Sequence, residues 1–250
     1  MITLKANIPP VAGPETLAEN EVHVWQISLR PSQDIIRDCC TILSPGEHDR
    51  ASRFHFERDA ERFIAARCAM RRILSLYTLV APKELAFCYG EKGKPYLSPL
   101  DRFDIQFNLA HSGEIGLLAV VQSGCVGVDI EMIDGAVDGD GIAERFFSRK
   151  EVKALRALSS EERTLAFFRC WTCKEAYIKA LGEGLSLPLD CFDVELNPRI
   201  APALLEVRGH VEEPSRWKIY DIPVPTGYQA ALVVEGFLHH LRLHSWEWEL

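Results

Sequence analysis

The sequence predicts a mixed α+β fold, in which helices and strands follow one another without strict alternation. Hydrophobic residues make up 47% of the 250 residues, which is enough for one large core or two smaller ones. Several short segments alternate apolar and polar side chains, as half-buried strands do. Other segments open on Ser-x-x-Glu, which is typical of a helix start. These patterns, taken in chain order, give the following elements.

In the first part of the chain, a strand is expected at residues 23–29, where alternate side chains are apolar. Ser44-Pro45-Gly46-Glu47 predicts a helix start, because the serine caps the helix, proline suits its first turn and glutamate closes a capping box. A longer helix follows from about Asp59, and Arg67 interrupts its otherwise apolar face. The glycine-rich stretch 90–95 is interpreted as a turn-rich loop.

Three strands are expected in the middle of the chain. Residues 103–109 alternate and end near His111, and residues 115–121 form a continuous apolar run that is typical of a central strand. The third strand covers 125–131, where every second residue is valine or isoleucine. Because side chains alternate along a strand, Asp129 shares the opposite face with its neighbours two positions away.

Helices dominate the next segment. Capping boxes begin at Ser148 and Ser159, and the second helix is expected to continue to about Leu181, with Gly182 as its C-terminal cap. Later segments resemble strands, at 192–196, 217–222, 230–234 and 237–250.

The charge balance is acidic, with 28 Lys and Arg against 36 Asp and Glu. This balance gives no general attraction to a phosphate backbone, so we expect no nucleic-acid partner. No apolar run approaches the roughly 18 residues that span a bilayer, and residues 1–16 do not resemble a secretory signal. We therefore expect a cytoplasmic protein without a membrane partner. A local basic group suits a small phosphorylated ligand or an ordinary solvated helix face; it comprises Arg50, Arg53, Arg58, Arg62, Arg67, Arg71 and Arg72.

The eight cysteines are irregularly spaced, which favours free thiols over a disulfide framework. Cys170 and Cys173 lie inside a predicted helix, where neither a redox pair nor a zinc site is expected. His239, His240 and His244 suggest a metal site on a helix, but the alternation around them favours a strand. We therefore assign no metal to them.

Asp129 and Glu131 are the first candidate site residues. At positions i and i+2 of a strand they project to one side, roughly 6–7 Å apart. A divalent cation relieves the repulsion between such carboxylates, and Mg²⁺ accepts one or two of them together with ligand phosphates. The alternative is an exposed strand face with two solvated acids, and the spacing alone favours neither interpretation.

Glu175 and Lys179 are the second pair, four positions apart on one helix face. A surface salt bridge of about 0.3–0.5 kcal/mol is the simpler interpretation. Trp171, one turn earlier on the same face, indicates that this face points inward instead. His111 stands where a strand enters a turn; it is either a structural residue or, with the flexible backbone after it, a phosphate contact.

Together these segments resemble the surfactin-type 4'-phosphopantetheinyl transferases over most of the chain, from about residue 44 to about 194. Each motif is weak alone, but their order and separation are specific. The motifs are Phe107-Asn108-Leu109-Ala110-His111-Ser112-Gly113, Gly127-Val128-Asp129-Ile130-Glu131, Arg145-Phe146-Phe147-Ser148, Trp171-x-x-Lys174-Glu175-Ala176-Tyr177-Ile178-Lys179 and Gly182-x-Gly184-Leu185-Ser186-Leu187-Pro188-Leu189.

The resemblance implies two similar α+β lobes related by a pseudo-twofold axis, residues 1–123 and 124–250, with the C-terminal strand packing back on the first lobe. It implies that coenzyme A binds between the lobes and that Mg²⁺, or Mn²⁺ in its place, is held by Asp129, Glu131 and Glu175. The catalytic residues would be Glu175, Lys179 and His111. The coenzyme A contacts would be Arg50, Arg62, Lys92, Gly93, Lys94, Pro95, Asn108, Ala110, His111, Asp129, Glu175 and Lys179.

Three positions depart from the pattern of the resembled family. Ala110 stands where a serine is frequent, so a hydroxyl contact is lost. Glu47 stands where close relatives carry lysine, and Phe63 where they carry a small polar residue. The change at Glu47 bears on the strength with which the 3'-phosphate of coenzyme A is expected to bind.

The resemblance implies a monomeric enzyme that transfers phosphopantetheine from coenzyme A to a serine of an apo carrier protein and releases 3',5'-ADP. Fatty-acid, polyketide and nonribosomal-peptide carriers are all candidate partners. The alternatives are a non-catalytic coenzyme A sensor, an unrelated Mg²⁺-dependent transferase, and an interaction protein that presents the arginine-rich helices. Three retained acids, the absence of a P-loop sequence and the motif order favour the transferase.

Overall fold

A computed structural model describes residues 15–98, 103–238 and 240–248 and confirms the mixed α+β class. Its described part divides into two compact units. The first unit contains residues 15–89, 95–98, 103–123 and 240–248, and the second contains residues 90–94 and 124–238. Each unit has its own sheet, its own long helix and its own hydrophobic core.

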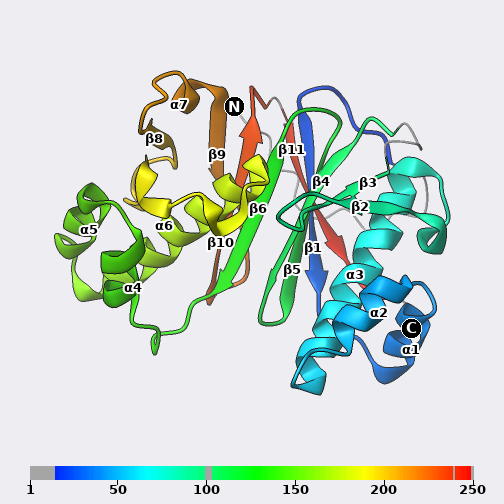
Figure 1. Cartoon of the computed structure of the whole chain (residues 1–250). Helices are drawn as coiled ribbons and strands as arrows, with labels where there is room; N and C mark the ends of the chain where they lie inside the picture. The colour runs from blue at the N-terminus through cyan, green and yellow to red at the C-terminus, as the bar shows by residue number, and fades with distance from the viewer. Residues whose placement is uncertain (1–14, 99–102, 239, 249–250) are drawn as a thin grey trace. The chain divides into compact units, whose positions relative to one another are not determined.

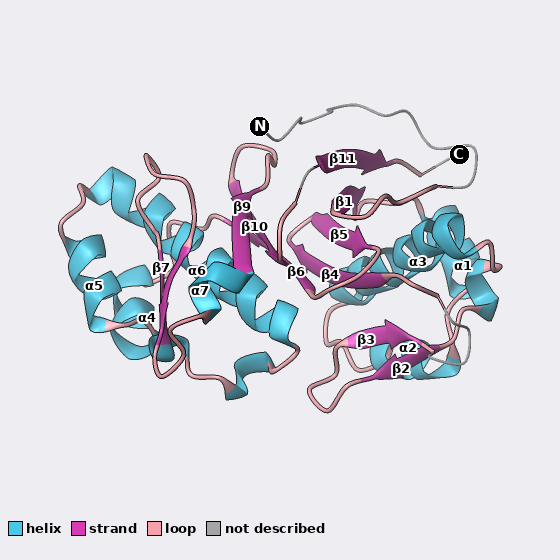
Figure 2. Cartoon of the chain, turned by 90° about the horizontal axis from the view of Figure 1, so that it is seen from above, coloured by secondary structure: helices cyan, strands magenta, loops and turns pink. Residues whose placement is uncertain are grey.

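The first unit is built on a four-stranded sheet in the order β11-β1-β5-β4. β1 runs parallel to β11 and antiparallel to β5, which pairs antiparallel with β4. The long helix α3 covers one face of the sheet (Figure 2) and buries Met70, Ile73 and Leu74 against it. The elements are β1 (Glu21–Ser28), β4 (Gln106–Ser112), β5 (Ile115–Val121), β11 (His240–Trp246) and α3 (Glu57–Thr78).

Shorter elements surround this sheet. β2 and β3 form a small antiparallel hairpin. Its loop, residues 90–94, belongs to the second unit. The remaining elements of the first unit are α1 (Gln33–Cys40), α2 (Pro45–Ala51), η1 (Pro82–Glu84), β2 (Phe87–Tyr89) and β3 (Pro95–Leu97).

The second unit is built on an antiparallel sheet in the order β6-β10-β9, with the long helix α6 packed on β6 and β10 (Figure 1). These elements are β6 (Val126–Met132), β9 (Trp217–Asp221), β10 (Tyr228–Glu235) and α6 (Ser160–Leu181). The others are α4 (Gly139–Phe146), α5 (Arg149–Arg156), η3 (Gly184–Ser186), η4 (Leu189–Cys191), β7 (Phe192–Val194), β8 (Leu204–Val207) and α7 (Glu213–Arg216).

The expected helix ends are confirmed. Ser44 and Ser148 each form a complete capping box, and the Ser159 hydroxyl accepts from the backbone N–H at the start of α6. Gly182 ends α6 with a φ of 77°, a left-handed conformation that glycine adopts without steric cost. The hairpin β2–β3 and strand β8 were not predicted, because three or four residues are too few to display alternation.

Some predicted boundaries were wrong. β4 begins at Gln106 instead of residue 103, and β11 covers only His240–Trp246 of the predicted 237–250. The prediction for 237–250 also falls partly on His239 and residues 249–250, which lie outside the described residues. All eight cysteines are free thiols, and Cys170 and Cys173 are buried inside α6. Among the described helices, none is both long and apolar enough to span a bilayer.

The arginine that interrupts the apolar face of α3 belongs to a buried ion-pair cluster. Glu47 is only 2% exposed, and its carboxylate accepts from Arg67 Nε at 2.7 Å and from Arg71 Nε at 2.8 Å. The same carboxylate caps α2 through Ser44. Arg71 also donates to two backbone carbonyls, so its charge is fully paired. Arg67 and Arg71 therefore do not contribute to an exposed basic face, contrary to that interpretation.

β6 and α6 approach each other unusually closely at Gly127. A Cβ atom at this position would lie 2.0 Å from the Ala176 carbonyl oxygen and 2.4 Å from the Ala180 nitrogen. Both atoms belong to the backbone of α6, so no side-chain rotation can make room. Only glycine permits this packing.

A cluster of polar side chains, several of them buried, lies at the two parallel strands β1 and β11. The rings of His23 and His244 lie 4.7 Å apart, and the Tyr77 hydroxyl lies 2.7 Å from His23 Nδ1. Glu21 pairs with Arg242 beside them. Burial lowers the pKa of His23 to about 4, with a further decrease from His244, and burial likewise lowers the pKa of His244 to about 4.

We predict that Gly127→Ala destabilises the protein strongly, by about 3 kcal/mol or more, because the new methyl group overlaps helix backbone. The midpoint of urea unfolding measures this. Gly135→Ala is the matched control, since a Cβ there meets nothing within 4 Å. Equal midpoints for the two variants would contradict the close approach.

We also predict that the stability contributed by the two buried histidines is lost as pH falls from 6.5 towards 4. The buried histidines are neutral in the fold, whereas the unfolded chain binds protons below pH 6.5, so their contribution is complete above pH 6.5 and is lost on acidification. Each histidine contributes about 2 kcal/mol to this loss at pH 5. Unfolding midpoints at several pH values should show a flatter dependence for His244→Phe than for wild type, and an unchanged one for the exposed control His210→Phe.

Candidate active site

Asp129 and Lys179 form the centre of the site that β6 and α6 build. Asp129 lies on the face of β6 that packs on α6, and it is 3% exposed. Lys179 Nζ on the last turn of α6 donates to Asp129 Oδ1 at 2.5 Å. Asp129 pairs with Ala231 of β10, so its backbone is fixed by the sheet while its carboxylate is fixed by the helix.

Glu131 and Glu175 complete this group, and we call the four residues Asp129, Glu131, Glu175 and Lys179 the β6–α6 site. Burial raises the pKa of Asp129 to about 7 against the opposing effect of Lys179, and Glu131 and Glu175 raise it further. Burial also raises the pKa of Glu175, with a contribution from Glu131. Burial by itself would lower the pKa of Lys179. The three carboxylates outweigh this effect and hold the pKa above the usual value for a lysine. Three acids therefore share one ammonium.

The donor set of the β6–α6 site fits a divalent cation. Asp129 Oδ2 is buried and has no hydrogen-bond partner among the described residues. The excess of negative charge is what a cation relieves. Within the described part of the chain, no three acidic, histidine or cysteine side chains form a ready-made metal cage. Mg²⁺ does not need one, because it retains waters and takes phosphate oxygens in addition to one or two carboxylates.

Lys94 also binds these two elements, through their backbone. Its ammonium donates to the carbonyl oxygens of Lys179 at 2.6 Å, Val126 at 3.0 Å and Ala180 at 3.3 Å. Burial lowers the pKa of Lys94 to about 8. The sequence indicated a coenzyme A contact for this residue but not these helix and strand contacts.

Lys174, in the same motif as Glu175, has a structural role. It is completely buried and donates to the carbonyl oxygens of Leu189 at 2.7 Å and Phe192 at 2.6 Å. Its third partner is Glu151 at 2.9 Å, the residue that closes the capping box of α5. Lys174 thus ties α6 to the segment that follows it, whereas Glu175 and Lys179 belong to the β6–α6 site.

In the first unit, Arg50 lies at a pocket of about 480 Å³ that Gly46, Arg53 and Phe54 also line. The guanidinium of Arg50 lies 5.5 Å from the centre of the Phe63 ring. The Phe63 ring supports Arg50 by a cation–π contact. Neither Arg50 nor Arg53 has an ion-pair partner among the described side chains, so the pocket carries uncompensated positive charge.

The other predicted coenzyme A contacts have varied surroundings. Asn108 and Ala110 are buried in β4, while His111 near its end is exposed. Arg62 lies 3.5 Å from Asp59 and 3.9 Å from Glu114, so its charge is partly compensated. Pro95 begins β3, and the loop before it contains the exposed Lys92 and Gly93, whose φ of 82° makes the turn.

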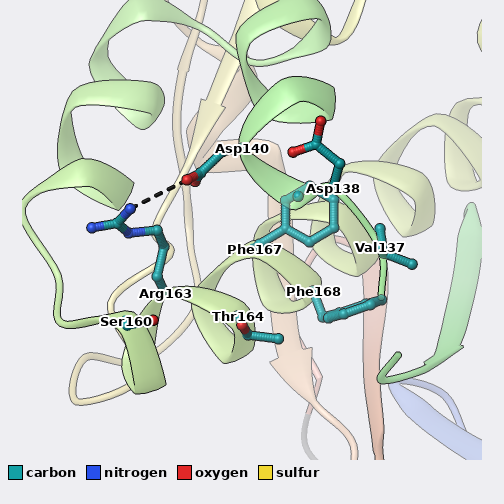
Figure 3. A pocket seen from close by; sticks show the side chains of 9 residues that line it. Val137, Asp138, Asp140, Ser160, Arg163, Thr164, Phe167 and Phe168 are labelled. Carbon is teal, nitrogen blue, oxygen red and sulfur yellow. Dashed lines mark hydrogen bonds and ion pairs between the residues drawn. The ribbon is translucent and has the colours of Figure 1, made fainter. Parts of the chain in front are cut away.

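A second pocket, of about 190 Å³, lies at the N-terminal ends of α4 and α6 (Figure 3). Its walls include the rings of Phe167 and Phe168, and Arg163 pairs across it with Asp140 at 3.2 Å. No residue that the sequence predicted as functional lines this pocket.

The acids and Lys179 could be singled out from sequence because residue periodicity defines a face of a strand or helix. Two features could not. The sequence placed Arg53 in a basic group but did not indicate the pocket that it lines with Arg50 and Phe54, because a pocket depends on tertiary packing. The carbonyl contacts of Lys94 involve backbone atoms more than 80 positions away in α6, and residue types carry no signal for backbone partners.

Comparisons with known proteins identify the family of the chain. A model of the 4'-phosphopantetheinyl transferase superfamily matches residues 125–233, and a model of the N-terminal part of 4'-phosphopantetheinyl transferases matches residues 27–123. The chain is 37% identical over 225 residues to the 4'-phosphopantetheinyl transferase HetI of Nostoc sp., covering 89% of this chain and 91% of the relative.

Two further similarities were found. The chain is 34% identical over 157 residues to the 4'-phosphopantetheinyl transferase Sfp of Bacillus subtilis, covering 63% of this chain and 68% of Sfp. A solved structure described as a Chronobacterium ammoniagenes ACPS-CoA complex superposes with a TM-score of 0.36 and 21% identity, covering 47% of this chain and 99% of that one. The family models and the extended identity to HetI establish that the chain belongs to the surfactin-type 4'-phosphopantetheinyl transferases, enzymes that attach phosphopantetheine to carrier proteins.

Proposed function

We propose that this transferase moves the 4'-phosphopantetheine moiety of coenzyme A to a serine hydroxyl of an apo acyl or peptidyl carrier protein. The serine oxygen forms a bond to the phosphorus that carries pantetheine, the bond from that phosphorus to the diphosphate oxygen breaks, and 3',5'-ADP leaves. The observation that carries the proposal is the β6–α6 site, where three carboxylates share one lysine and a buried carboxylate oxygen lacks a partner.

Asp129, Glu131 and Glu175 would hold Mg²⁺, or Mn²⁺ in its place. When bound, the ion neutralises and orients the diphosphate oxygens, which is the main requirement of phosphoryl transfer. The raised pKa values of Asp129 and Glu175 support this assignment, because they indicate a shortage of positive charge between the acids.

The chain's own residues supply the remaining chemistry. Lys179 is protonated and adjacent to Asp129, so its ammonium can neutralise charge on the leaving diphosphate oxygen. Glu175 has a pKa above the usual value of a glutamate, which suits a group that accepts the serine proton directly or through a water molecule. We assign His111 to the phosphates, because it stands exposed near the end of β4 beside a glycine turn.

The uncompensated charge of Arg50 supports its assignment to the 3'-phosphate of coenzyme A. Arg62 is assigned a weaker contact, since Asp59 and Glu114 already share its charge. The remaining coenzyme A contacts are proposed from the family resemblance alone, at Lys92, Gly93, the backbone of Lys94, Pro95, Asn108 and Ala110.

We further propose a monomeric cytoplasmic enzyme built as two lobes, 1–123 and 124–250, related by a pseudo-twofold axis. Incubation with coenzyme A, Mg²⁺ and a panel of apo carrier proteins, read by mass spectrometry, tests the function directly. Each modified carrier should gain one phosphopantetheine group. No gain on fatty-acid, polyketide or peptide-synthase carriers would refute the proposed activity.

We predict that Asp129→Ala and Glu175→Ala each lower the transfer rate at saturating substrate by about a hundredfold or more while the protein remains folded, because each removes a ligand for charge neutralisation. Glu161→Ala, an exposed acid in the first turn of the same helix, is the control and should retain full activity. Circular dichroism checks the fold of each variant. Rates near wild type with Mg²⁺ for either site variant would exclude the metal assignment.

We predict that Arg50→Ala raises KM for coenzyme A by about tenfold and changes kcat much less, because the 3'-phosphate is remote from the reacting phosphorus. Dephospho-coenzyme A should discriminate little between Arg50→Ala and wild type. Arg37→Ala, an exposed change on α1, should behave as wild type with both substrates. The same loss with coenzyme A and dephospho-coenzyme A would rule out the 3'-phosphate contact.

A further inference from the structure

Lys94 lies in the loop between β2 and β3, but its side chain is bound to β6 and α6. An ammonium group has three N–H donors, and Lys94 has three acceptors, the carbonyl oxygens of Val126, Lys179 and Ala180. All three acceptors are backbone atoms of the two elements that carry the β6–α6 site. The positive charge is therefore used to hold backbone, and no donor of this ammonium is left for another partner.

Two of these carbonyl groups lie at a point where a helix needs external donors. The last four carbonyls of an α-helix have no N–H partner within the helix, and Lys179 and Ala180 belong to the last turn of α6. A cation also complements the negative end of the helix dipole. Gly182, which ends the helix, lies beside this side chain, since Lys94 Cδ would be in ordinary van der Waals contact, at 3.8 Å, with a Cβ there.

The third acceptor connects this helix end to the catalytic strand. Val126 is the first residue of β6, an edge strand of its sheet and the strand that carries Asp129. Lys179 is thus held at both ends, by its carbonyl oxygen on Lys94 at 2.6 Å and by its ammonium on Asp129 at 2.5 Å.

We propose that Lys94 is a positioning residue of the transferase, which fixes the last turn of α6 against the start of β6 and so keeps Lys179 and Glu175 in register with Asp129. Gly127 allows the strand and the helix to approach, and Lys94 supplies the attraction that fixes their mutual position at the helix end. This inference rests on the proposed roles of the β6–α6 site.

A direct contact between Lys94 and coenzyme A would have different consequences. Loss of a substrate contact remote from the reacting phosphorus raises KM and leaves kcat nearly unchanged. Loss of a positioning residue lowers kcat, because small displacements of catalytic groups reduce the rate strongly, and it leaves KM for coenzyme A nearly unchanged.

The test compares Lys94→Met, which keeps the length of the side chain without its donors, with Lys153→Met, the same change at an exposed position of α5. Lys94→Arg restores a cationic donor. Transfer kinetics are measured with coenzyme A and an apo carrier, and hydrogen exchange is measured on the last turn of α6 without any substrate or metal. If Lys94→Met does not fold, Lys94→Gln takes its place in both measurements.

We expect Lys94→Met to lower kcat by about tenfold or more with KM for coenzyme A within about twofold of wild type. Amide exchange at residues 178–182 should accelerate in this variant and not in Lys153→Met. Lys94→Arg should recover most of kcat. A raised KM with normal kcat, or unchanged exchange at the end of α6, would overturn the proposal.

The outcomes also separate this inference from the proposed function. Full activity of Asp129→Ala and Glu175→Ala would refute the roles of the β6–α6 site, whereas the exchange rates at the end of α6 report on Lys94 alone. Faster exchange together with normal kcat in Lys94→Met would show a purely structural contact and would overturn the positioning role.

Discussion

The close backbone approach of β6 to α6 at Gly127 is the constraint on which the β6–α6 site depends. It brings the strand that carries Asp129 and Glu131 against the helix that carries Glu175 and Lys179. A side chain at this position would separate the two elements. Because the space is filled by backbone atoms of the helix, packing elsewhere in the core cannot substitute for it. The hydrophobic core of this unit stabilises the arrangement, but glycine permits it.

The electrostatics of the site follow from this approach. Asp129 is removed from water together with a lysine 50 positions away, while two further acids remain close enough to raise its pKa. Burying these carboxylates costs free energy unless each negative charge is paired with a positive one. Shifted pKa values of this kind are common at functional sites. A divalent cation, as proposed above, would supply the positive charge that the three acids lack.

In the first unit, Glu47 stands at one of the positions expected to depart from the family pattern. Its buried carboxylate pairs with Arg67 and Arg71 while it caps α2. The residue therefore serves the packing of α2 on α3. Arg50 lies on the same helix, and its guanidinium lies 5.5 Å from the centre of the Phe63 ring. Because Glu47 is engaged by Arg67 and Arg71, the positive charge of Arg50 at its pocket stays uncompensated.

The sequence by itself determined the fold class, most helix caps and the faces on which Asp129, Glu175 and Lys179 lie, because local periodicity and capping depend on nearby residues. It also suggested the family, from the order of short motifs. Only the tertiary structure decided that Arg67 and Arg71 are buried and pair with Glu47, that Lys94 binds carbonyl oxygens of β6 and α6, and that Arg53 shares a pocket with Arg50. These contacts join residues that are distant along the chain or involve backbone atoms, and the identity of a side chain does not specify such partners until the elements have packed.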